Sequence, residues 1–247
     1  MEKQLVGYIT TGFPDKDFTI DLALSLGENG VDSLELGIPF SDPVADGPVI
    51  EAANYVALGN GFRFKDVLDV SHAVAPRVDT LWMGYFNSFY QFGMENVLRE
   101  ANDLGVSGLI IPDLPHEEAV AYAEAFAKHR VSNISFVAPT DSDARIKTVV
   151  EHSEKFIYLV AYAGITGAGK SEELSGVVAS IRKYTQTPVY VGFGVNEATA
   201  KEKAQGVDGV IVGSAFINVL LREDLTLSEK INHCCSIAKT IKARINE

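Results

Sequence analysis

Short apolar runs alternate with longer amphipathic stretches along the whole chain. The apolar runs are bounded by turn residues and predict buried strands over residues 5–10, 33–36, 80–83, 108–111, 134–137, 156–160, 189–192 and 210–212. The stretches between them carry helical patterns, such as those over residues 17–27, 64–74, 94–104, 116–129 and 197–205. Eight strands alternating with helices over about 250 residues are typical of a (β/α)₈ TIM barrel, here a single domain over residues 1–247.

The alternative α/β architecture is a doubly wound open sheet. The number of predicted strands and the absence of a Gly-x-Gly-x-x-Gly fingerprint disfavour it. No low-complexity segment or linker marks a domain boundary. The barrel is therefore the preferred interpretation.

An internal repeat draws attention to one acidic residue. Its three copies read GVDSLELG at 30–37, GVSGLIIP at 105–112 and GVDGVIVG at 206–213. Each copy is interpreted as a helix-ending glycine, a short link and a buried strand. Glu35 stands where the other copies carry Ile110 and Ile211. Burying a carboxylate costs free energy, so a functional role is favoured over a structural glutamate paired with a buried base.

A second carboxylate follows Glu35 closely. Residues 35–48 read ELGIPFSDPVADGP, which places Asp46 on a loop punctuated by prolines and glycine. Glu35 has apolar neighbours, whereas Asp46 belongs to this stiffened loop. Two carboxyl groups in such different settings can hold different pKa values and divide acid and base work.

Glycines at the ends of the last two predicted strands indicate a phosphate site. Strand 189–192 ends in Gly192-Phe193-Gly194, and strand 210–212 is followed by Gly213-Ser214. In TIM barrels the loops after strands seven and eight often present backbone N–H groups to a phosphate. The alternative is that these glycines only turn tight corners.

Residues 163–170 read AGITGAGK and, with Ser171, satisfy the regular expression of a nucleotide P-loop. That motif belongs at the start of a long helix in a doubly wound sheet, and a helical stretch does follow here. A lid over the barrel mouth is preferred to a nucleotide site, because the glycines after the last two strands already supply a phosphate site.

Composition narrows the classes of function. A net charge of −12 disfavours nucleic acid as a partner, and no apolar run approaches the roughly 20 residues that span a bilayer. With no signal-peptide pattern at the N-terminus, we expect a cytoplasmic location. No histidine cluster indicates a metal site, and no lysine falls inside a predicted strand, which argues against a Schiff-base aldolase.

Taken together, these motifs resemble the tryptophan synthase alpha chain family over nearly the whole chain. The most specific element is the run at 35–48, supported by PDLP at 112–115, GITG at 164–167, Gly192-Phe193-Gly194 and Gly213-Ser214. The resemblance implies a (β/α)₈ barrel that cleaves indole-3-glycerol phosphate to indole and glyceraldehyde 3-phosphate. It also implies an α₂β₂ heterotetramer with the tryptophan synthase beta chain. That partner carries pyridoxal phosphate, and no cofactor is expected in this chain.

The resemblance also implies roles for single residues. Glu35 matches the catalytic glutamate and Asp46 the catalytic aspartate. Substrate-binding positions are Tyr158, with Tyr8 and Phe193 as apolar walls, the lid residue Thr166, and the phosphate ligands Gly167, Gly194, Gly213 and Ser214. Asp42 and Pro43 match the loop that faces the beta chain, with exposed turn residues as the alternative.

Two departures from the family pattern are visible. The chain begins almost at its first strand, whereas many relatives carry an extra N-terminal helix under the barrel. Tyr162 stands where some relatives carry a lid arginine. The first departure concerns how the barrel floor is sealed, and the second concerns lid closure and signalling to the beta chain.

Two other functions stay open from the residues alone. One is another phosphate-binding barrel enzyme, such as a sugar-phosphate isomerase, although strand 5–10 ends in Thr10-Thr11 with no carboxylate or cysteine. The other is an inert subunit that only activates its partner. The presence of both Glu35 and Asp46 argues against an inert subunit.

Overall fold

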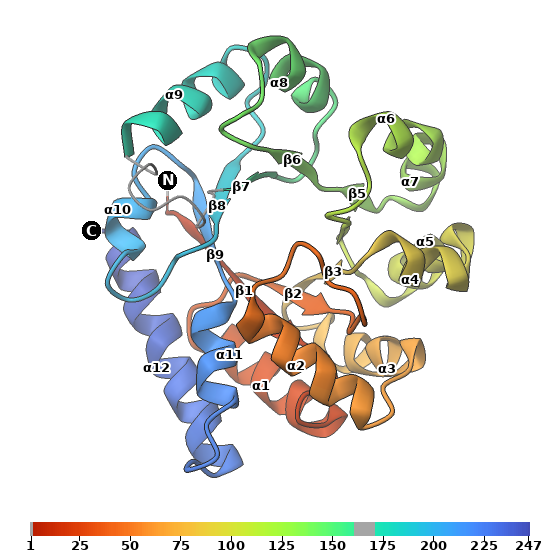
Figure 1. Cartoon of the computed structure of the whole chain (residues 1–247), viewed down its shortest axis with the longest axis vertical. Helices are drawn as coiled ribbons and strands as arrows, with labels where there is room; N and C mark the ends of the chain where they lie inside the picture. Colours follow the sequence, from red (N-terminus) through yellow and green to blue (C-terminus); the bar gives the residue numbers. More distant parts are fainter. Residues whose placement is uncertain (1, 161–170) are drawn as a thin grey trace.

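Parallel strands form the centre of the protein, and helices surround them (Figure 1). This computed structural model describes residues 2–160 and 171–247. The strands are β1 (Gln4–Thr10), β2 (Ser33–Gly37), β3 (Asp79–Met83), β4 (Gly108–Ile110), β5 (Ser132–Asn133), β6 (Ser135–Val137), β7 (Ile157–Val160), β8 (Val189–Gly192) and β9 (Gly209–Val212). Their order, β5-β4-β3-β2-β1-β9-β8-β7-β6, brings the first strand between the second and the last.

The two ends of this sheet belong to one stretch of chain. β5 pairs with β4, β6 pairs with β7, and only Ile134 separates β5 from β6. The predicted strand 134–137 is therefore shorter than expected. The chain pairs with β4 up to Asn133 and with β7 from Ser135 onward, so the strand is interrupted at Ile134. The strands thus form a nearly closed barrel, and the predicted TIM-barrel fold class is confirmed.

Most helices lie between two consecutive strands in the chain and cover the outside of the barrel. In chain order they are α1 (Lys16–Glu28), α2 (Pro48–Gly59), α3 (Phe64–Val74), α4 (Phe86–Phe92), α5 (Met94–Leu104), α6 (His116–Ala119), α7 (Ala123–His129), α8 (Asp143–Val150), α9 (Ser171–Arg182), α10 (Ala200–Lys203), α11 (Ser214–Leu220) and α12 (Leu227–Ile245). The predicted helix 116–129 is interrupted by a 3₁₀ turn at Val120–Tyr122. Among the described residues, no helix has the length and apolar character needed to cross a membrane.

The three glycines of the internal repeat have the conformation that their position requires. Gly30, Gly105 and Gly206 all adopt positive φ, at 101°, 79° and 76°. A side chain is strained in this left-handed region, whereas glycine is not, so each copy can stop its helix and turn into the next strand. The repeat interpreted from the sequence is confirmed at these positions.

Apolar side chains fill the inside of the barrel as well as the layer between strands and helices. The inner cluster comprises Val6, Leu81, Ile110, Ile134, Phe156 and Ile211. Two members, Ile110 and Ile211, are the repeat counterparts of Glu35. The position of Glu35 is thus one that an apolar residue fills in the other copies.

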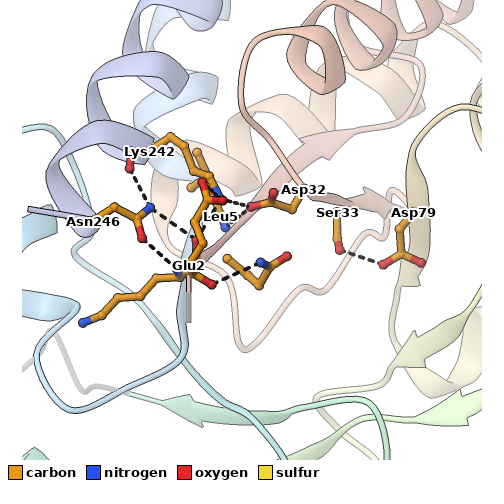
Figure 2. Close-up of polar contacts among 9 residues, drawn as sticks. Glu2, Leu5, Asp32, Ser33, Asp79, Lys242 and Asn246 are labelled. Atoms are coloured by element: carbon orange, nitrogen blue, oxygen red, sulfur yellow. Dashed lines mark hydrogen bonds and ion pairs between the residues drawn. The ribbon is translucent and has the colours of Figure 1, made fainter.

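Polar contacts tie the floor of the barrel to the last helix, as Figure 2 shows. Asp32 accepts hydrogen bonds from the backbone N–H of Leu5 (2.6 Å) and from the ammonium of Lys242 (2.8 Å). The side chain of Asn246 accepts from the backbone N–H of Lys3 at 2.8 Å. The first strand and the end of α12 are thereby fastened together at this end of the barrel.

Candidate active site

Glu35 points from β2 into the barrel. It lies in register with Tyr8 of β1 and Leu81 of β3, and its side chain is almost fully buried, with 2% of the residue exposed. Its Oε1 atom has no hydrogen-bond partner among the described residues. A buried carboxyl oxygen left without a partner is costly to folding and suits a group that acts on a ligand.

Burial and a neighbouring acid raise the pKa of Glu35 to about 8. Loss of hydration is the larger cause, and the negative charge of Asp46 is the second. A buried basic partner would lower this pKa instead, so the structural alternative considered for Glu35 does not describe its surroundings. The carboxyl group is largely protonated at neutral pH.

Asp46 approaches from the loop between β2 and α2. The side-chain amide of Asn54 on α2 donates a hydrogen bond to its Oδ2 at 3.2 Å. Burial raises the pKa of Asp46 to about 6, against the opposing hydrogen bonds of Asn54 and Tyr85. At neutral pH Asp46 is therefore mostly ionised while Glu35 is mostly protonated, which is the division of states that acid and base work requires.

Tyr85 holds the loop that carries Asp46. The backbone N–H of Ala45 donates to the Tyr85 hydroxyl at 2.9 Å, and the ring of Phe40 stacks on the Tyr85 ring at 5.2 Å. Tyr85 is itself buried just after β3. Contacts from Tyr85, just after the neighbouring strand β3, thus restrain the loop in addition to its own prolines.

Two inward-facing tyrosines pack directly against glycines on the adjacent strands. A Cβ atom on Gly37 would lie 2.3 Å from the Tyr8 hydroxyl oxygen, and one on Gly192 would lie 2.4 Å from the ring of Tyr158. Real Cβ atoms do not approach other atoms so closely, so both strand positions require glycine if the tyrosines keep their places. The two rings occupy the same part of the barrel as the carboxylates.

These four side chains affect one another electrostatically. Burial, followed by the charges of Glu35 and Asp46 and by Tyr8, raises the pKa of the Tyr158 hydroxyl. The pKa of Tyr8 is likewise raised by burial and then by Asp46. Four residues from β1, β2, β7 and the loop after β2 therefore border one site.

Comparison with known proteins gives the family. The family described as tryptophan synthase alpha chain matches residues 1–246. The tryptophan synthase alpha chain of Wolinella succinogenes is 54% identical over 245 residues, covering 99% of this chain and 96% of the relative. This chain belongs to the tryptophan synthase alpha chain family.

Solved structures agree with this assignment. A structure of Mycobacterium tuberculosis tryptophan synthase aligns with a TM-score of 0.90 at 33% identity, covering 100% of this chain and 93% of that chain. The tryptophan synthase subunit alpha of Campylobacter jejuni aligns with a TM-score of 0.88 at 30% identity, covering 96% of each chain. As a member of the family, the chain is a carbon–carbon lyase that cleaves indole-3-glycerol phosphate in tryptophan biosynthesis.

Residues predicted for the phosphate lie after the last two strands of the barrel. Gly194 has φ at +71° and open space around it, and Gly213 directly precedes Ser214, the first residue of α11. Phe193 also has positive φ, at 72°, and its ring meets that of Tyr158 edge-on at 6.4 Å. Phe193 thus lies next to Tyr158, and its role as an apolar wall of the substrate site stays a prediction.

Three lid positions fall outside the residues that the structure describes. They are Tyr162, Thr166 and Gly167. The P-loop-like run at 163–170 falls in the same segment. The roles inferred for these residues remain predictions.

Sequence reasoning missed two residues that hold Asp46. Asn54 and Tyr85 were given no role, although both bear on the pKa of Asp46. Asn54 could have been found, because it lies on the apolar face of α2 between the buried residues Ala53 and Ala57. A polar residue on the buried face of a helix calls for a partner.

Proposed function

We propose that Glu35 and Asp46 carry out the retro-aldol cleavage of indole-3-glycerol phosphate. The observation that supports this is the buried Oε1 atom of Glu35, which has no hydrogen-bond partner among the described residues and borders the same site as Asp46. The surroundings raise the pKa values of the two carboxyl groups to different levels, about 8 and about 6. Such a pair supplies a proton donor and an anion at the same pH.

In the proposed reaction the protonated Glu35 first transfers its proton to carbon 3 of the indole ring. The ring nitrogen then carries positive charge, and the Asp46 carboxylate accepts the hydrogen bond of its N–H. A hydrogen bond to a charged group contributes about 1.5–3 kcal/mol, and here it forms most strongly when the ring is cationic.

The Glu35 carboxylate next removes the proton from the hydroxyl group on the carbon attached to the ring. The bond between that carbon and carbon 3 breaks, its electron pair returns to the ring and neutralises the nitrogen, and the carbon becomes an aldehyde. Indole and glyceraldehyde 3-phosphate result, and Glu35 ends protonated as it began. Side chains alone carry this sequence of proton transfers.

Binding of the substrate is assigned to the walls and strand ends of the site. Tyr8, Tyr158 and Phe193 enclose the ring, and backbone N–H groups at Gly194, Gly213 and Ser214 bind the phosphate. Thr166 and Gly167 complete the site from the lid in this proposal. The absence of a Cβ at Gly194, where nothing lies within 4 Å of the Cβ position, leaves the backbone open to the phosphate oxygens.

The proposed partner is a tryptophan synthase beta chain, in an α₂β₂ heterotetramer in the cytoplasm. The beta chain would hold pyridoxal phosphate and receive the indole. The loop after β2 offers a contact surface, since Asp42 is exposed and Val44 is 84% exposed, whereas Pro43 is buried and supports the loop from inside. A largely exposed valine next to the site is suited to cover by another protein.

Release of indole from indole-3-glycerol phosphate tests the proposal, measured with and without an added beta chain. We expect slow turnover by this chain alone, equimolar glyceraldehyde 3-phosphate, and faster turnover once the partner is present. Intact binding of the substrate with no turnover in either condition would contradict the proposal and favour an inert phosphate-binding subunit.

A further inference from the structure

We propose that the hydroxyl groups of Tyr8 and Thr10 form a pair that binds the hydroxyl-bearing carbon chain of the substrate. The pair would distinguish indole-3-glycerol phosphate from indole phosphates whose chain lacks hydroxyl groups. This inference rests on the proposed function, because it assumes that the substrate lies between Glu35 and the phosphate residues. It gives Tyr8 a polar role in place of the purely apolar one expected from the sequence.

Both side chains face the inside of the barrel from the same strand. Residues 8 and 10 alternate with outward-facing positions of β1, so their side chains lie on the same face. The Tyr8 hydroxyl and the Thr10 Oγ1 atom are 3.3 Å apart, and either can be the donor. Tyr8 is 4% exposed and Thr10 is 1% exposed, so the pair is almost fully removed from solvent.

This pair has hydrogen-bonding capacity that their mutual contact does not use. Each hydroxyl group carries one proton and two lone pairs. Their mutual contact is the one hydrogen bond that either hydroxyl group makes among residues 2–160 and 171–247, so one proton and several lone pairs are left available there. Buried polar groups normally use such capacity. A ligand that brings hydroxyl groups of its own can both donate to and accept from the pair.

Contacts of the Tyr8 ring place the ring between the two parts of the proposed site, with its hydroxyl group at the end nearer Glu35. Its hydroxyl oxygen lies over Gly37, two residues beyond Glu35 on β2, where a Cβ would come within 2.3 Å. The other side of the ring faces Gly213, where a Cβ would lie 3.3 Å from the Tyr8 Cβ. The carbon chain of the substrate has to cross this interval to join a ring at Glu35 to a phosphate at Gly213.

The electrostatic surroundings keep the Tyr8 hydroxyl protonated. Burial raises its pKa, and the charges of Asp46 and Glu35 raise it further, against the hydrogen bond with Thr10. The group therefore remains neutral throughout the working range of pH, with a proton to donate. A neutral donor suits substrate hydroxyl groups, which carry no charge.

The test compares two ligands in the variant Tyr8→Phe. One is indole-3-glycerol phosphate, followed by kcat/KM, and the other is an indole with an unsubstituted three-carbon phosphate chain, followed by its inhibition constant. We expect kcat/KM to fall by about five- to tenfold, the equivalent of one neutral hydrogen bond, and the inhibition constant to stay within about twofold. Equal losses for both ligands would show that Tyr8 acts through packing alone and would overturn the proposal, as would no loss for either.

Thr10→Val gives a second, independent variant. It removes the other hydroxyl group and keeps nearly the same shape, so we expect a similar selective loss. The double variant should lose less than the product of the two single losses, because paired hydroxyl groups act as a unit. Fully independent losses would contradict the pair. Failure of the proposed function would look different, since the unaltered chain would then release no indole.

Discussion

Acidic side chains occur at both ends of the barrel, but their neighbours differ. At the floor, Asp79 lies 2.8 Å from the ammonium of Lys155, and Asp32 lies at the same distance from Lys242. At the mouth, the charge of Asp46 raises the pKa of Glu35, the charge of Glu51 raises the pKa of Asp46, and no cation is among the causes of either shift. The acidic side chains at the floor of the barrel are paired with lysines, whereas those at the mouth have acidic neighbours.

Partners, rather than burial alone, decide the protonation state of a buried acid. Burial would raise the pKa of Asp79, but hydrogen bonds from Lys155 and Ser33, among others, lower it overall. Its contribution to stability is therefore lost as pH falls through the lowered pKa. For Glu35 burial is unopposed, so stability is lost as pH rises from 4.5, the ordinary value, through about 8.

Glu35→Gln should lower activity more than any of the other variants. The amide keeps the shape of the side chain but cannot pass a proton to the indole ring and take another back. We expect kcat to fall by about 1,000-fold, with KM little changed and the melting temperature at pH 8 unchanged or higher, because a buried carboxylate is removed. Steady-state indole release and thermal unfolding measure these quantities. Full activity in this variant would rule out the proton transfers assigned to Glu35.

Gly37→Ala should come next, with a loss in kcat/KM of about 100-fold. The added methyl group would meet the Tyr8 hydroxyl, so the ring must move into the space assigned to the substrate. Overpacking of this kind costs about 1–3 kcal/mol of stability, which circular dichroism during urea unfolding would measure. Gly59→Ala at the end of α2 is the matched control, because a Cβ there meets nothing within 4 Å. Equal kinetics in the two variants would contradict the close approach at Gly37.

A smaller and pH-dependent effect is expected from Asn54→Leu. The reaction needs Asp46 ionised and Glu35 protonated, so kcat/KM should rise with pH near 6 and fall near 8. Loss of the Asn54 hydrogen bond raises the pKa of Asp46 further. The acidic limb should therefore move upward by about one pH unit while the alkaline limb stays in place.

Profiles of kcat/KM between pH 5 and 9 for both proteins would measure the shift. Movement of both limbs together would mean that Asn54 does not act on Asp46 in particular.

The smallest effect on activity is expected at the floor. Lys155→Met leaves Asp79 without its cation, and we expect a loss of about 1 kcal/mol in the free energy of unfolding, with kcat/KM within twofold of the original value. Lys201→Met, which removes an exposed ion pair with Glu247, is the control and should change neither quantity. A large loss of turnover in Lys155→Met, with the fold intact, would contradict the assignment of stability to the floor of the barrel and of catalysis to its mouth.

The strands could be predicted well because a buried parallel strand is a continuous apolar run, and β8 matches its predicted range at both ends. The break at Ile134 could not, since it arises from the two neighbours that β5 and β6 each follow. Glu35 stood out through the internal repeat, which is a property of sequence. The support of Asp46 by Asn54 and Tyr85 depends on how a loop, a helix and a strand end meet in space, which no local pattern records.

The positions of Tyr8 and Tyr158 in the site depend on the absence of a methyl group at Gly37 and at Gly192. The pairing of the strands uses backbone atoms only, so it is indifferent to whether those methyl groups are present. Change of a glycine codon to an alanine codon takes one base substitution, and at either position it would displace an inward-facing tyrosine in a barrel whose ladder of hydrogen bonds is intact. Loss of catalysis and loss of assembly are thus genetically separable in this protein. A duplicated gene could pass in one step from an enzyme to a folded subunit with little chemistry of its own.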